Sequence, residues 1–441
     1  MFQLAMPALG EQLLAFCVGL FDTWLAGQIS TSASTAVGLA AYVDWLATLM
    51  FNAVGIGTSA LVARHWGAKQ GDQSNLAYNQ AVPLALVIGA VSGLFIFTLA
   101  PYFAHLQGLR RMSPETEAIG IHYLRLSACG HLFHSLTLVT NAGLRGAGDM
   151  RTPLSILAVV NGVNILASSS LVFGWGVPSQ GIYGIVLGTL IARIVGFVVS
   201  LLFLLRGRSG LRLEAALLFP RWDWIQRMLR IGIPAMGDGL LMWVGHFLFI
   251  MIIANLATGE LGRANYAAHM VAINIEALTY LPAVALGTSA ATLVGHSLGA
   301  GQPLEAWRYG QRAAFICGCY SILTAVIYFS GAGAIFRIMH RDPLVQEIGS
   351  SAFRYLAIYQ IPLVFLIVYT SVLRGAGDTR TPVLFTILGT LLVRLPVAYL
   401  CGIYWHGGLL GAWTGMMVDV WIRCLLATTY YYRGAWLKTS V

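Results

Sequence analysis

The sequence predicts an all-α polytopic membrane protein with twelve transmembrane helices in two parallel-repeat six-helix bundles. Of its 441 residues, 58% are hydrophobic and only 10% are charged, and the mean hydropathy is +0.75. Soluble domains carry about 25% charged residues, so this chain cannot cover a water-facing surface. Apolar stretches alternate with short loops, and at roughly 20 residues a span twelve spans leave no room for a large soluble domain. A motif that occurs twice divides the spans into two sets of six.

Hydropathy predicts the twelve helices in order along the chain. We expect them near 5–27, 34–62, 76–104, 116–143, 153–173, 182–205, 226–257, 265–297, 304–337, 346–372, 382–402 and 408–432. The first stretch lacks a basic n-region and contains Asp22, which argues against a cleaved signal peptide. We therefore expect it to be retained as a helix.

The basic residues predict the orientation of the chain in the membrane. Of the 26 Lys and Arg residues, 16 lie in the even-numbered loops, in the helix ends that adjoin them or in the C-terminal tail. The odd-numbered loops contain five, which are Arg110, Arg111, Arg263, Arg337 and Arg341. Cytoplasmic loops carry the excess of basic residues, so we expect both termini in the cytoplasm. The location is a cell inner membrane or plasma membrane.

The duplicated motif is the strongest internal signal. Residues 144–153 read LRGAGDMRTP and residues 373–382 read LRGAGDTRTP, nine identities in ten at an offset of 229. In each copy, glycines allow a positive φ at a helix end, and Asp149 and Asp378 can cap the next helix. We expect the motif arginines to anchor the turns at the lipid surface, so its role is structural.

A similar offset pairs MPALGEQLL at 6–14 with IPAMGDGLL at 233–241. The predicted domains are therefore an N-terminal bundle over 1–205, a cytoplasmic linker over 206–226 and a C-terminal bundle over 227–441. Six is an even number, so both copies enter the membrane from the same side as parallel repeats. Two such bundles favour alternating-access transport, although channels and membrane enzymes also contain duplicated bundles.

Several other classes of protein and site are disfavoured. The six cysteines have no C-x-x-C ladder, which argues against a zinc site or a disulfide framework. The basic residues are scattered through loops, so nucleic acid is not an expected partner. No G-x-x-x-x-G-K-[ST] motif indicates phosphate binding, and no nucleophile–base pair indicates an enzyme.

The paired motifs, the F-D-T-W-L-A-G segment at 21–27 and the segment 267–301 resemble the multidrug and toxic compound extrusion (MATE) transporters, in their prokaryotic DNA-damage-inducible F-like branch. The resemblance covers essentially the whole chain. It implies a V-shaped pair of six-helix bundles that exports amphiphilic, often cationic or aromatic compounds in exchange for protons or sodium. It also implies a monomer among membrane lipids, with no cofactor beyond the ion gradient and no resident metal.

Six acidic residues lie five or more residues from either end of a predicted helix, where such residues are rare and functional by default. They are Glu11, Asp22, Asp44, Asp238, Glu276 and Asp419. The resemblance implies that Asp22 carries the coupling cation, with Asn164 and Thr189 as its partners on the fifth and sixth helices. Ser168 stands where the family has a further aspartate. That loss favours proton over sodium coupling, as does Met242 near the place of a glutamate in the sodium-coupled branch.

Two helix stripes are candidate linings of a substrate cavity. His269, Glu276 and Tyr280 share one face of the eighth helix, and Asp44 and Phe51 share one face of the second. Carboxylates among aromatic rings suit apolar cations. Glu11 and Asp238 are further candidates. An alternative for Glu276 is a hydrogen bond to a neighbouring helix, and Asp419 and Arg423 are expected to form an intrahelical pair.

We interpret the chain as a proton-coupled exporter of amphiphilic small molecules and not as an enzyme. The alternative function is a flippase for a lipid-linked oligosaccharide, which would need several cationic residues in its cavity. The alternative coupling ion is sodium.

Overall fold

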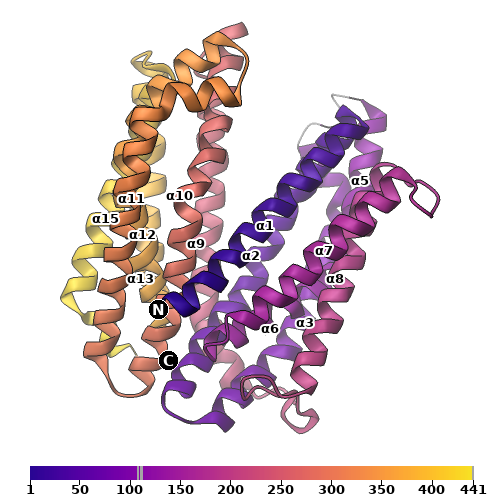
Figure 1. Cartoon of the computed structure of the whole chain (residues 1–441), viewed down its shortest axis with the longest axis vertical. Helices are drawn as coiled ribbons and strands as arrows, with labels where there is room; N and C mark the ends of the chain where they lie inside the picture. The colour runs from indigo at the N-terminus through magenta and orange to yellow at the C-terminus, as the bar shows by residue number, and fades with distance from the viewer. Residues whose placement is uncertain (107–108, 110–112, 440–441) are drawn as a thin grey trace. The chain divides into compact units, whose positions relative to one another are not determined.

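The computed structural model describes residues 1–106, 109 and 113–439, and this part of the chain is helical without a β-strand (Figure 1). Arg110 and Arg111, which entered the prediction of orientation, lie outside the described residues. Eleven of the described helical segments are long and apolar enough to cross a membrane. The two shorter helices α5 and α6 follow one another in the place of the predicted fourth span. Together they account for twelve spans and confirm the predicted fold class.

The chain divides into two compact units, residues 2–236 and residues 237–441 with Met1. The first unit contains α1 (Phe2–Ile29), α2 (Thr31–Gly67), α3 (Gly71–Leu106), α5 (Pro114–Cys129), α6 (His131–Gly146), α7 (Arg151–Phe173), α8 (Ile182–Leu205), η1 (Ala215–Leu217) and the start of α9 (Trp222–Ala254). The predicted division at 205 and 227 stays a prediction.

The second unit contains the rest of α9 and the six-helix repeat. Its elements are α10 (Gly259–Gly299), α11 (Pro303–Met339), α12 (Pro343–Gly375), α13 (Arg380–Thr386), η2 (Ile387–Arg394), α14 (Leu395–Tyr399), η3 (Leu400–Tyr404), α15 (Gly408–Arg433) and η4 (Ala435–Lys438).

Helix ends follow local capping chemistry. The Ser113 side chain accepts the backbone N–H of Thr116 at 3.0 Å, and Pro114 occupies the first turn of α5. Asp342 caps α12 in the same way, again with a proline next in the chain. Gly174 ends α7 with φ 78°, a left-handed conformation that glycine adopts without strain.

Two predicted helices differ from the structure in their internal geometry. The expected single helix over 116–143 is interrupted at Gly130, where a side chain would collide with Arg193 of α8. The expected helix over 382–402 includes two π-helical stretches, η2 and η3. π-Helical turns in other proteins often occur at functional sites.

The linker is fixed to α3 by buried amide side chains. Asn79 donates to the backbone oxygen of Arg212 at 2.8 Å, and Gln80 donates to that of Leu217 at 2.6 Å. Asn75 donates to the Glu214 carboxylate at 2.8 Å. The segment after α8 is therefore ordered against the first unit.

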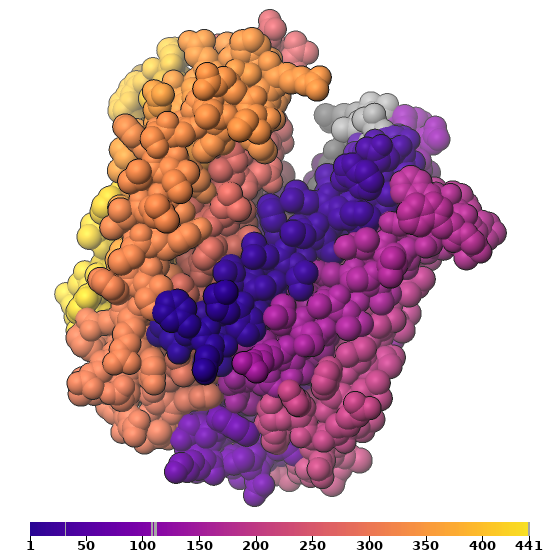
Figure 2. Space-filling model, in the orientation of Figure 1, coloured from indigo at the N-terminus to yellow at the C-terminus, as the bar shows by residue number. Residues whose placement is uncertain are grey.

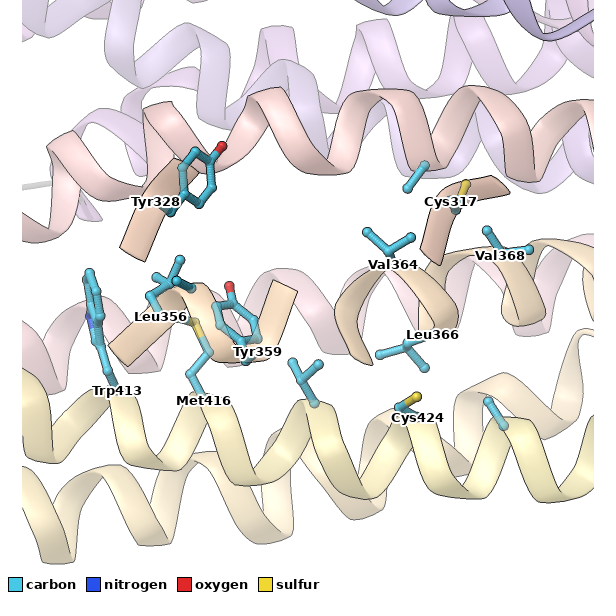
Figure 3. Packing of buried hydrophobic residues seen from close by; sticks show 14 of the residues in the cluster. Cys317, Tyr328, Leu356, Tyr359, Val364, Leu366, Val368, Trp413, Met416 and Cys424 are labelled. Carbon is cyan, nitrogen blue, oxygen red and sulfur yellow. The ribbon is translucent and has the colours of Figure 1, made fainter. Parts of the chain in front are cut away.

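Each unit has its own core. In the second unit Tyr328, Tyr359, Trp413, Met416 and Cys424 are buried where α11, α12 and α15 meet (Figure 3). In the first unit α1 runs alongside α7 on the surface of its unit (Figure 2). Only five of the 28 residues of α1 are buried, so it is thinly held.

Candidate functional site

Asp22 is a half-buried carboxyl with an unsatisfied oxygen. It lies on α1, in the last two turns of the helix, just before the buried pair Leu25 and Ala26. Its Oδ1 is shielded from solvent and has no hydrogen-bond partner among the residues that the structure describes. Arg193 of α8 interacts with it electrostatically.

The three residues expected to accompany Asp22 lie together between α7 and α8. Asn164 donates through Nδ2 to the Thr189 hydroxyl at 3.0 Å, and Thr189 donates to the backbone oxygen of Ile185 at 3.1 Å. Ser168 donates to the same carbonyl at 3.3 Å and packs tightly on Gly188. In the described part of the chain, no hydrogen bond joins these three side chains to Asp22.

Asn164 has the same deficiency as Asp22. Its Oδ1 is buried and has no partner within the described ranges. Buried polar atoms are almost always paired, and each exception calls for an explanation. Both orphaned atoms are acceptors, so the group lacks a donor or a cation. A proton on the carboxyl, a hydrated proton or a small cation would satisfy it.

Asp44 on α2 belongs to a buried polar network instead of a free stripe. Its carboxylate accepts from Arg193 Nη2 at 2.8 Å, from Ser127 at 3.0 Å and from His131 Nε2 at 2.9 Å. Phe51 has no exposed surface and packs edge-on against His131 and its neighbour on the next turn. Both residues therefore lie inside the first unit, because the fourth and sixth helices of the repeat supply partners for them.

In the second unit, Glu276 accepts a hydrogen bond from the Tyr359 hydroxyl on α12. This is the alternative that the sequence left open for it. His269 is fully buried and accepts from Trp413 Nε1 at 3.2 Å. Tyr280 is half-buried on the same helix. The eighth-helix stripe thus has two buried members, each bonded to a neighbouring helix.

The intrahelical pair of Asp419 and Arg423 is confirmed at 2.6 Å, and it is part of a larger group. Arg394 of η2 donates through Nε and Nη2 to Asp419 Oδ2 at 2.7 and 2.6 Å. The remaining Nη1 of Arg423 reaches only the Met242 sulfur, at 3.4 Å. One buried carboxylate therefore forms ion pairs with two guanidinium groups, and the three side chains together carry one net positive charge.

The motif turns are capped as expected. Asp149 accepts the backbone N–H groups of Arg151 and Thr152, each at 3.0 Å, and Asp378 accepts that of Thr381 at 3.2 Å. The expectation that all motif arginines lie at the lipid surface is wrong for the first arginine of each copy. Because each has an acidic partner within reach, Arg145 turns inward to Glu11 and Arg374 to Asp238.

The two repeats differ at the place of the Asp22 group. At the offset of 227 that aligns α1 with α9, Asp22 corresponds to Phe249. Contacts between helices give the correspondence further along. Gly188 packs on Ser168 and Gly415 packs on Ala398, so Ser168 corresponds to Ala398. Asn164 and Arg394, each four residues earlier, then correspond to one another. In the second unit the guanidinium carbon of Arg394 lies 6.0 Å from the centre of the Phe249 ring. A fixed cation thus takes the place of an unsatisfied acceptor.

The sequence did not identify the basic partners Arg193, Arg145, Arg374 and Arg394 of the intramembrane acids. The available signal was charge balance, because buried acids need cations and few arginines fall inside the helices. The described residues contain no group of three or more His, Cys, Asp or Glu side chains placed to hold a metal ion.

A family model described as MatE matches residues 7–168 and 234–400. The chain is 29% identical to the probable multidrug resistance protein NorM of Thermotoga maritima, over 100% of this chain and 93% of that protein. It is also 29% identical to the multidrug resistance protein PmpM of Pseudomonas aeruginosa, over 95% of this chain and 87% of that protein.

Solved structures share the fold. A crystal structure of MATE in the straight conformation superposes with a TM-score of 0.91 at 19% identity, over 100% of this chain and 96% of that one. A transporter of the MOP superfamily from Pyrococcus furiosus gives 0.90 at 20% identity with the same coverage. The all-helical, two-repeat architecture is therefore common to these proteins.

Proposed function

Since this chain belongs to the MATE family and is a transporter and not an enzyme, we propose that it is a multidrug efflux antiporter driven by protons. It exports amphiphilic, often cationic compounds from the cytoplasm. The motif end of each unit faces the cytoplasm, with both termini, and the protein works as a monomer among membrane lipids. The assignment to the DNA-damage-inducible F-like branch stays a prediction.

The observation that carries the coupling proposal is the orphaned Oδ1 of Asp22 on α1, together with the orphaned Oδ1 of Asn164 on α7, the helix that packs along α1. A proton on Asp22 satisfies the carboxyl, and its loss creates a charge within the field of Arg193. The two forms favour different packing of α1, which has few buried residues to resist a change. A proton biases two conformations only through its different affinity for them, and this site supplies such a difference.

Proton coupling is favoured over sodium by the donor set. Ser168 replaces a carboxylate and is already bonded to the backbone of α8. The Thr189 hydroxyl already accepts from Asn164 and donates to the Ile185 backbone oxygen. Sodium favours several hard oxygen ligands, and the loss of this carboxylate leaves fewer of them, which favours a proton.

Coupling is confined to the first unit. Phe249 and Arg394 occupy the corresponding place in the second unit, and Arg394 is ion-paired with Asp419. The flippase alternative requires free cationic side chains for pyrophosphate. Three intramembrane arginines (Arg193, Arg394 and Arg423) are already ion-paired, which argues against it.

The substrate proposal rests on Glu276 and Tyr280 of α10. Their carboxyl and ring suit an aromatic cation, and the Tyr359 hydroxyl holds the carboxyl in place. Glu276→Gln should reduce export of a cationic dye more than export of a neutral one. Equal loss for both would contradict this role.

The experiment is transport in proteoliposomes under an imposed ΔpH or ΔNa, with tetraphenylphosphonium and ethidium as probes. The parent protein should exchange at least one probe for protons. Asp22→Asn should keep its fold and insertion and lose ΔpH-driven exchange, while the exposed control Asp72→Asn retains it. Unchanged rate and pH dependence in Asp22→Asn would remove Asp22 from the mechanism, and a response to ΔNa alone would replace the proton by sodium.

A further inference from the structure

We infer that the first arginine of each duplicated motif is a positioning residue that clasps the first helix of its own unit. The clasp of the first unit is Glu11 with Arg145, and that of the second unit is Asp238 with Arg374. The inference rests on the proposed transport function for its role, although its geometry does not depend on that function.

The two clasps are copies of one arrangement. Glu11 and Asp238 share an offset of 227, and each follows a helix proline by four residues. The arginines share the offset of 229 of the motif. The acidic side chain is a glutamate in the first copy and an aspartate in the second, and each pairs with the arginine of its own motif. The two copies therefore share the ion pair, although the acidic residue differs.

The clasp joins elements that have little other contact. Arg145 reaches Glu11 through Nη1 at 2.6 Å, from the last turn of α6 to the second turn of α1 after Pro7. The buried residues of α1 form two groups, Ala5, Ala8 and Glu11 at one end and Leu25 and Ala26 at the other. Residues 12–24 contain no buried side chain. Within 12–24, the Asn161 side chain of α7 donates to the Leu14 backbone oxygen at 2.8 Å. The clasp is therefore the charged contact that holds the Pro7 end of α1, where few other side chains are buried.

The other charged groups of the motif have different tasks. Asp149 and Asp378 cap the next helix, and Arg151 and Arg380 are exposed. The first arginine of each copy is the one that crosses to the first helix of the repeat in the described part of the chain. The turn thus links the end of the fourth helix, the start of the fifth and the first helix at one place.

The clasps are built to open. The acidic side chains are 10% and 4% exposed, but the arginine side chains are 21% and 34% exposed, so water can reach the guanidinium when the pair separates. In the second unit Asp238 Oδ1 and Arg374 Nε are buried and have no partner in the described part of the chain. That pair leaves one acceptor and one donor unused, and it is held less firmly than a two-point pair.

The role that follows is control of the motif end of α1 and α9 during transport. While a clasp is closed, the first helix is held at that end. When it opens, the segment beyond Pro7 or Pro234 is released, because a proline lacks one backbone hydrogen bond of the helix. Arg145 thereby connects the first turn to the helix that carries Asp22, and Arg374 connects the second turn to α9.

Hydrogen exchange tests the clasp without requiring transport. In Glu11→Gln and in Arg145→Met, amides of residues 2–14 should exchange at least tenfold faster, while those of α9 stay unchanged. In Asp238→Asn, amides at the start of α9 should exchange faster, while those of residues 2–14 stay unchanged. The charge-swapped Glu11→Arg/Arg145→Glu protein should return toward the parent, and Glu305→Gln, which breaks an exposed pair within α11, should change neither segment.

Cross-linking tests the opening step. In a protein whose other accessible cysteines are replaced, Glu11→Cys and Arg145→Cys are joined by a reducible bis-thiosulfonate. Transport of tetraphenylphosphonium should stop and return on reduction. Full transport in the joined protein would overturn the opening step, and unchanged exchange in Glu11→Gln and Arg145→Met would overturn the clasp. Either result leaves the Asp22 test intact, so the two proposals fail separately.

Discussion

Replacing Asp419 by Asn should be among the most damaging single changes in the second unit. The carboxylate has no exposed surface and accepts four charge-assisted bonds, from Nε and Nη2 of Arg394 and of Arg423. The two arginines are only 6% and 5% exposed. The group carries one net positive charge in the parent, and Asp419→Asn raises it to two without solvent to compensate.

The magnitude follows from that charge count. Removing one partner of a buried ion pair costs about 3–5 kcal/mol, because the other charge is left uncompensated. Arg423→Met leaves a neutral Asp419–Arg394 pair and loses only the bonds of one arginine, which we expect to cost about 1–3 kcal/mol. The double variant restores one net charge and should be more stable than Asp419→Asn alone.

The assay is equilibrium unfolding in detergent, followed by tryptophan fluorescence, since Trp413 and Trp436 are buried in the same unit. The expected order of stability is parent, then Arg423→Met, then the double variant, with Asp419→Asn lowest. If Asp419→Asn were as stable as Arg423→Met, the charge argument would be refuted, and the group would be held by packing alone.

Three further predictions use the same assay or a pH series. Burial opposes ionisation of Asp149 in its loop, but hydrogen bonds from Thr152 and Ser209 outweigh it and hold the pKa of that carboxyl below its usual range. Asp149→Asn should therefore lower the free energy of unfolding by about 0.5–2 kcal/mol near pH 7. The difference in stability between parent and variant should vanish as the pH falls through the lowered pKa of Asp149 in the folded state. A difference that stays the same at low pH would contradict this linkage. Gly232→Leu should destabilise the first unit by about 1–3 kcal/mol, because even a Cβ at Gly232 collides with the Ala53 backbone, and parent-like unfolding would disprove that contact. Trp436→Ala should cost about 3–5 kcal/mol, since the ring has no exposed surface, and a loss under 1 kcal/mol would show that the tail is not docked.

The fold could be predicted from the sequence because composition and repetition act over the whole chain. Apolar spans of sufficient length leave a membrane helix as the only structure that pairs all backbone groups, and the doubled motif fixes two equal halves. The Asp419–Arg423 pair and the Asp149 cap were also predictable, since each joins residues only three or four apart.

The partners of the candidate site could not be predicted in the same way. Asp44 meets Arg193 from 149 residues away, and Glu11 meets Arg145 from 134 residues away. Helical periodicity gives the face of one helix and does not say which face of another helix it meets. The sequence therefore indicated Asp22, Asn164 and Thr189 through a family motif. It did not predict which acidic residue each intramembrane arginine pairs with, and it placed the motif arginines at the lipid surface.

The π-helical stretch η2 changes how the residues of the two repeats correspond. The motifs that precede α7 and α13 are offset by 229 residues, but beyond η2 the helix contacts match at 230, with Ser168 and Ala398 facing equivalent glycines. Relative to the first repeat, the second therefore holds one insertion of a single residue, and the π-helical geometry of η2 absorbs it. Each residue turns an α-helix by about 100°, so without the insertion Arg394 would point away from Asp419. The two units therefore differ in chemistry at corresponding places, with unsatisfied acceptors on Asp22 and Asn164 in the first unit and a buried ion-paired arginine in the second.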